Sequence, residues 1–125
     1  MSENKDYVSH VVDNGSIHIS EEVIASITAM AVQEVEGVYG LSSNNSELGK
    51  IAKMNTGKGV RLVISADDEI SIDCYIVVLY GYSVVDVAKS VQETVTSTVE
   101  STTGRKVRSV NVNISGISLP KNAKK

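Results

Sequence analysis

Residues 70–79 alternate between two kinds of side chain, and this run constrains the fold more than any other feature of the chain. Because successive side chains of a β-strand point to opposite faces, the pattern predicts a strand over 70–80 with one buried face. The buried set would be Ile70, Ile72, Cys74, Ile76 and Val78, and the outward set Ser71, Asp73, Tyr75, Val77 and Leu79. A strand over 60–66 is expected to precede it through the tight turn Asp67-Asp68-Glu69, and a last alternating strand is expected over 107–117.

Two other segments repeat apolar residues at helical spacing. The first begins after Ser20, a favourable N-cap, and is expected to span 21–36 before Gly37 ends it. The second begins after Ser83 and is expected to end at Gly104. Their apolar stripes are Val23, Ile24, Ile27, Met30, Ala31 and Val35 in the first, and Val84, Val87, Ala88, Val91, Val95 and Val99 in the second.

Turn signals organise the remaining connections. Asn14-Gly15 lies between the β-prone runs 7–12 and 16–19, which predicts a hairpin whose two turn residues take positive φ angles. Residues 42–59 form a polar connection that contains glycine. Ser46 is a candidate N-cap there for a short helix through Met54.

The order β-α-β-β-α-β predicts a two-layer α+β fold, with two main helices packed on one face of a small, mostly antiparallel sheet. We expect a single domain over 15–118, preceded by a segment (1–14) that is partly flexible or forms the first hairpin strand. Residues 119–125 would be a short basic tail. Since the chain has no Phe and no Trp, aliphatic residues must fill the core.

Charge and hydropathy limit the classes of partner and the cellular location that we expect. The net charge is −3 with acidic and basic residues interspersed, whereas nucleic-acid binders normally carry a basic footprint. The polar N-terminus predicts no signal peptide, and the longest apolar run, 74–79, is too short to cross a bilayer. We therefore expect a cytoplasmic protein that reaches a membrane only peripherally, through a partner and without direct insertion.

The chemistry-bearing residues are few. His10 and His18 have no partners at metal-ligand spacing, and Cys74, on the buried strand face, is expected to act as a small hydrophobe. The acidic turn 67–69 lacks the spacing of a calcium loop, and the glycines around Lys58 lack that of a phosphate loop. We expect no catalytic residue, no metal and no cofactor, and hence a protein that is not an enzyme.

Two binding surfaces remain. The first is the outward sheet face, which is more apolar than solvation requires; its candidate partner residues are Val63, Tyr75, Val77 and Leu79. Residues 42–59 or a second copy of the chain could instead cover that face. The alternative is a small RNA-binding module that uses a GxxG loop, Gly37-Val38-Tyr39-Gly40, and the basic edge Arg105–Arg108. A small-ligand or fatty-acid carrier has no visible pocket signature.

An ordered series of motifs extends over residues 15–118. It comprises 15–25 (GSIHISEEVIA), 34–38 (EVEGV), 57–60 (GKGV), 72–78 (IDCYIVV), Tyr80-Gly81, 87–93 (VAKSVQE) and 110–117 (VNVNISGI). The series resembles the alkaline shock protein family of Gram-positive bacteria. The resemblance implies a non-enzymatic cytoplasmic protein that acts as a binding or scaffold factor in cell-envelope homeostasis or stress response. It also implies a membrane-anchored protein partner and a link to lipid metabolism, with no catalytic residues to carry over. From the residues themselves we expect the chain to bind a protein partner, or a second copy of itself, through the open sheet face or a sheet edge.

Overall fold

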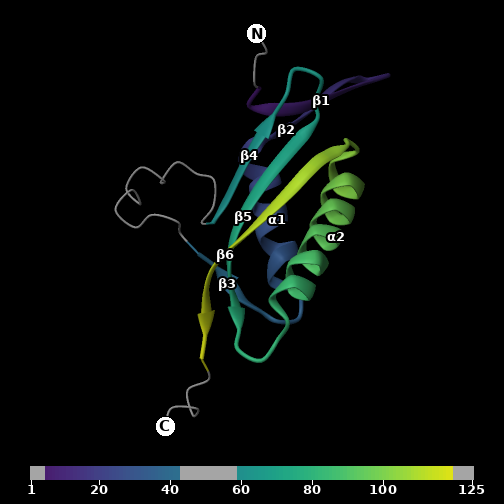
Figure 1. Cartoon of the computed structure of the whole chain (residues 1–125). Coiled ribbons are helices and arrows are strands. Elements are labelled where there is room, and N and C mark those ends of the chain that lie inside the picture. Colours follow the sequence, from purple (N-terminus) through teal and green to yellow (C-terminus); the bar gives the residue numbers. More distant parts are fainter. Residues whose placement is uncertain (1–4, 43–58, 120–125) are drawn as a thin grey trace.

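A computed structural model describes residues 5–42 and 59–119, which form a helical layer and a sheet layer (Figure 1). The elements in chain order are β1 (Tyr7–Val12), β2 (Gly15–Ser20), α1 (Glu21–Gln33), β3 (Val38–Leu41), β4 (Val60–Ile64), β5 (Ile70–Leu79), α2 (Val84–Thr103) and β6 (Val107–Ser118). The predicted α+β class with both helices on one sheet face is confirmed. The short helix expected from Ser46 to Met54 lies outside the described residues.

Both helices begin directly after their predicted N-cap residues. The Ser20 hydroxyl accepts a hydrogen bond from the Val23 backbone N–H, and the Ser83 hydroxyl accepts one from that of Asp86, each at 3.3 Å. Helix α2 ends at Gly104, which takes a left-handed conformation, as predicted. Helix α1 ends at Gln33, three residues before the expected end at 36, because the chain turns over 34–37 to enter β3.

Strand β5 is the centre of the main sheet (Figure 1). On one edge it pairs antiparallel with β4 along 70–74 and with β3 along 76–78, so these two short strands lie end to end. On the other edge it pairs with β6 in parallel, which the crossover through α2 makes possible. Strand β3 is a feature that the sequence does not predict, since the pattern of residues 37–40 indicates a helix stop or a glycine loop.

The predicted hairpin forms a separate two-stranded sheet, β1–β2, which projects past the end of the main sheet (Figure 1). Its register pairs Val12 with Gly15, so the turn residues are Asp13 and Asn14 rather than Asn14 and Gly15. Only Gly15 of these three has a positive φ angle, which makes the predicted turn conformation wrong by one position. Val8 on β1 is fully buried, and a bridge from Lys5 to Ile64 joins the hairpin to β4.

The core is aliphatic, as the absence of Phe and Trp requires. The predicted inward face of β5 is fully buried at every position, and helix α2, which packs beside α1 and β6, buries one valine per turn in the same core. These valines also hold the Thr- and Ser-rich second half of α2, whose intrinsic helix propensity is low. The buried residues of the two elements are Ile70, Ile72, Cys74, Ile76 and Val78 in β5, and Val87, Val91, Val95, Val99 and Thr103 in α2.

Candidate functional site

The outward face of β5 carries the predicted partner residues. Tyr75, Val77 and Leu79 occupy alternate positions near the end of the strand, and all three are half-buried. Val63 lies on the same face of β4, where it is 48% exposed. The period-two alternation therefore placed all four side chains on the face away from the helices.

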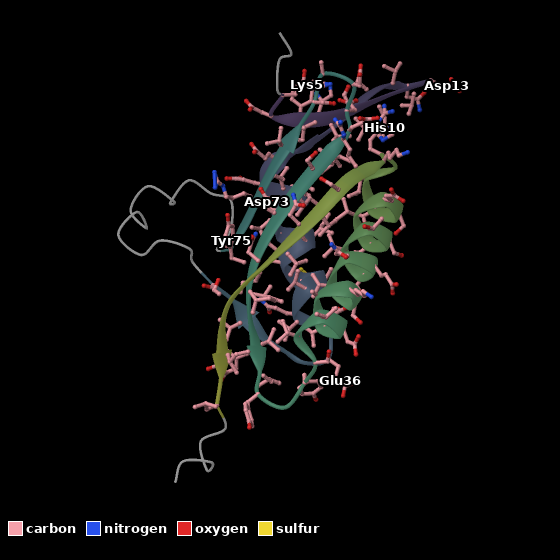
Figure 2. The ribbon with its side chains drawn as sticks, viewed as in Figure 1. Lys5, His10, Asp13, Glu36, Asp73 and Tyr75 are labelled. Carbon is pink, nitrogen blue, oxygen red and sulfur yellow. The ribbon has the colours of Figure 1, made fainter. Side chains whose placement is uncertain are left out.

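The four residues do not form one continuous patch. Val63 pairs with Ser71, four residues or roughly 13 Å along β5 from Tyr75. A polar row crosses the sheet between them: Asp73 pairs with Arg61 on one side and with Asn111 on the other. The Asn111 amide donates a hydrogen bond of 2.9 Å to the Asp73 carboxylate. Figure 2 labels Asp73 and Tyr75 on this strand, where the polar row meets the apolar one.

Val77 is the middle residue of the apolar row Tyr75, Val77 and Leu79, and it has unusual neighbours. Its cross-strand partners are Gly40 on β3 and Gly116 on β6, so no side chain stands beside it on either neighbouring strand. A Cβ atom built on Gly40 or on Gly116 would meet no heavy atom within 4 Å. Among the described residues, the face thus offers a valine side chain with open space on both sides, between Tyr75 and Leu79.

The alternative RNA interface loses its loop and the Arg105 part of its basic edge. Residues 38–41 form β3 rather than a loop, and the Gly37 carbonyl accepts a hydrogen bond from the Leu79 backbone at 2.8 Å. A KH-type clamp needs a free loop there, so the GxxG interpretation is wrong. The basic edge is also engaged within the molecule, since Arg105 donates to the Ser9 carbonyl at 2.6 Å and Arg108 lies 3.8 Å from Glu69.

An ion-pair cluster around Asp68 fastens the hairpin to the main sheet. Asp68 pairs with Lys5 and with Arg105, whose guanidinium lies 3.6 Å from the carboxylate, and it also accepts the Ser9 backbone N–H at 3.4 Å. Burial alone would raise the pKa of Asp68, but the hydrogen bonds and positive charges of these partners outweigh burial and hold that pKa below its ordinary value. We call Lys5, Asp68 and Arg105 the Asp68 cluster.

The Asp68 cluster is a structural feature that the sequence interpretation, a simple hairpin turn, missed. His10 strengthens the same junction, because its Nε2 lies 2.7 Å from the Thr103 carbonyl oxygen at the end of α2. Figure 2 shows Lys5 and His10 together at the hairpin end of the molecule. His18 stacks on Tyr7 with ring centroids 4.7 Å apart, and both residues are exposed on the hairpin.

Cys74 is fully buried on the helix-facing side of β5, as predicted. Burial, with a smaller contribution from the charge of Asp73, raises the pKa of its thiol to about 12. In residues 5–42 and 59–119 there is no group of three or more His, Cys, Asp or Glu side chains placed to hold a metal ion. No helix in the same ranges is long and apolar enough to cross a membrane.

We expect the Cys74 thiol to be unreactive while the protein is folded. A thiolate is the attacking species, and a pKa of about 12 leaves a negligible thiolate fraction near neutral pH. Ellman's reagent should therefore label one thiol per chain rapidly in denaturant and almost none in the native protein over the same time. Stoichiometric labelling of the native protein would contradict the buried placement.

These features define a class: a small two-layer α+β domain whose sheet keeps one face uncovered by helices. The chain matches the family model of the alkaline shock protein 23 family, described as having a cell envelope-related function, over residues 9–119. Because this match covers most of the chain, the protein belongs to that family, and the resemblance seen in its motifs is confirmed.

Several relatives share the sequence over most of its length. YqhY of Bacillus subtilis (strain 168) is 39% identical over 82% of this chain and 77% of its own, and YloU of the same strain is 37% identical over 82% and 88%. Spy1535 of Streptococcus pyogenes serotype M6 is 34% identical over 88% and 84%. All three are uncharacterized proteins.

Two solved structures match this chain with TM-scores below 0.5. A triple variant of the MamM CTD has a TM-score of 0.47 at 19% identity, covering 79% of this chain and 94% of its own. A single-residue variant of MamM gives the same TM-score at 18% identity, covering 78% and 96%.

Proposed function

We propose that this protein is a non-enzymatic binding or scaffold factor in cell-envelope homeostasis, and that it binds a protein partner through Tyr75, Val77 and Leu79. The observation that carries the proposal is the row Gly40–Val77–Gly116, in which a half-buried apolar side chain has no side chain beside it on either neighbouring strand. Apolar surface that other side chains do not cover tends to mark interaction sites. Val63 lies beyond the polar row and is not part of the proposed contact.

The family's cell envelope-related function favours a membrane-anchored protein as the partner. Such a partner would hold the chain at the membrane without any insertion by the chain itself. The link to lipid metabolism rests on the motif resemblance alone. Recovery of a lipid-synthesis enzyme as the bound protein would support that link.

Val77→Asp is expected to reduce capture of the partner about ten-fold or more, because a charge would be buried where an apolar contact forms. A tagged copy would be recovered from membrane and soluble fractions of native cells, and bound proteins would be quantified by mass spectrometry. The matched control is Val11→Asp on the hairpin, where the replaced valine is 85% exposed and far along the chain from this face.

A second variant separates binding from folding. Gly40→Val adds a side chain beside Val77 where open space exists, so the fold should persist while the contact is obstructed. Circular dichroism melting would verify that the variants remain folded. If both variants recover the same proteins as the wild type, or if the wild type recovers none specifically, this site assignment is wrong.

A further inference from the structure

The outer edge of β6 differs between its two halves. Within the described part of the chain, β6 pairs only with β5, so its other edge faces away from the sheet. Alternate residues of a strand direct their N–H and C=O groups to opposite edges. The Lys106 carbonyl accepts from Ile70 and the Ser118 carbonyl from Tyr80, so both face β5. The pairing register shifts by one residue near each end of β6, and between the two shifts it is the odd-numbered residues, such as Asn111 and Asn113, that face β5.

Side chains of α2 bond to two backbone groups in the first half of this outer edge. The Val107 N–H donates to the Glu100 carboxylate, and the Val110 carbonyl accepts from the Gln92 amide, both at 2.9 Å. Val112 and Ile114 follow Val110 on the same edge. Neither has a backbone hydrogen-bond partner on that side among residues 5–42 and 59–119. Helix α2 therefore caps the edge as far as Val110 and leaves the remainder open.

We propose that this open half, Val112–Ser118, pairs antiparallel with the same strand of a second copy of the chain. The inference is independent of the proposed function, which uses the outward sheet face rather than this edge. An exposed strand edge is a template for pairing, and proteins usually protect it with charged residues or proline. Between Arg108 and Pro120 the sequence of β6 has neither.

The chemistry of the edge selects β6 itself as the occupant. Because this edge carries no charge, it cannot form ion pairs with a charged peptide. It is better matched by a neutral strand that has one apolar and one polar face. Strand β6 is such a strand, with Val112 and Ile114 on the helix side and Asn111 and Asn113 on the other. A two-fold axis normal to the sheet would set apolar side chains beside apolar ones and asparagines beside asparagines, in a closed dimer.

Exposed apolar side chains extend the contact beyond the backbone. Ile117 is 44% exposed and Leu119 67%. Tyr80, which is 64% exposed, is held beside them by the 3.0 Å hydrogen bond from its N–H to the Ser118 carbonyl. A second copy paired along β6 would cover these side chains, which adds apolar burial to the new backbone hydrogen bonds.

The first test is the oligomeric state of the full chain, measured by sedimentation over a wide concentration range. The wild type should form a dimer as concentration rises, and Ile117→Lys should raise the dimer dissociation constant at least ten-fold by bringing like charges together across the axis. Val11→Lys, the same kind of change at an exposed hairpin valine, should leave dimerisation unchanged. A wild type that stays monomeric at the highest concentration overturns the proposal, as does a dimer that Val11→Lys disrupts while Ile117→Lys does not.

Residue-resolved amide exchange on the wild type gives a second readout that needs no variant. The amides of Val112 and Ile114 should gain protection as the protein concentration rises. Those of Asn111 and Asn113, which face β5, should be protected at every concentration. A dimer in which Val112 and Ile114 exchange as fast as in the monomer would place the interface elsewhere and overturn the edge pairing.

Discussion

Gly37→Ala is expected to lower the free energy of unfolding by about 3–4 kcal/mol. Gly37 has a φ angle of 98°, a conformation that costs a residue with a side chain roughly 1–2 kcal/mol. A Cβ atom there would lie 2.6 Å from Val87 Cγ2 and 3.0 Å from the Tyr82 ring. It would therefore enter the contact between α2 and the turn that precedes β3. Overpacking of this kind typically costs a further 1–3 kcal/mol, roughly. Thermal and denaturant unfolding would measure the loss.

Gly81→Ala separates the cost of the backbone conformation from the cost of overpacking. Gly81 has nearly the same φ angle, 102°, but a Cβ atom built there meets nothing within 4 Å. It should therefore show the backbone cost alone, about 1–2 kcal/mol. If Gly37→Ala is no more destabilising than Gly81→Ala, α2 does not pack against Gly37 as closely as the structure shows.

The periodic elements of the fold could be predicted because each of them carries its own pattern. The valine stripe of α2 and the alternation of β5 specify both the element and its buried face, and the caps Ser20 and Ser83 fix the helix starts. Strand β3 could not be found this way. Its four residues include a glycine, and they form a strand only because β5, more than thirty residues later, supplies the partner.

The candidate site shows the same division between local and long-range information. Alternation placed Tyr75, Val77 and Leu79 on one face, but the polar row that isolates Val63 depends on cross-strand neighbours. The open space beside Val77 likewise depends on register, since Gly40 and Gly116 lie far from it in sequence. Pairing registers between distant strands are set by tertiary packing, so residue patterns within one segment could not reveal them.

The Asp68 cluster is the second position where a large effect is expected. Asp68→Ala should lower the free energy of unfolding by about 3 kcal/mol, since charge-assisted hydrogen bonds and buried ion pairs are costly to break from one side. The loss also includes a backbone contribution, because Asp68 has a φ angle of 64°, which alanine tolerates less well than aspartate. Asp67→Ala is the matched control. The Asp67 carboxylate, next along the chain, is exposed and makes no ion pair among the described residues, so its removal should change the free energy of unfolding little.

The pH dependence of the free energy of unfolding tests whether the charge of Asp68 causes this stabilisation. Since the partners hold the pKa of Asp68 below its unfolded value, its contribution is fully present above that unfolded value, about 3.9, and is lost as the pH falls through the lowered folded pKa. Asp68→Asn removes the charge and keeps a residue that accepts a positive φ angle. The stability difference between wild type and Asp68→Asn should thus be constant from about pH 5 to 8 and shrink below about pH 4. A difference that persists unchanged into acid would mean that Asp68 stabilises the hairpin junction through its shape and neutral hydrogen bonds rather than through Lys5 and Arg105.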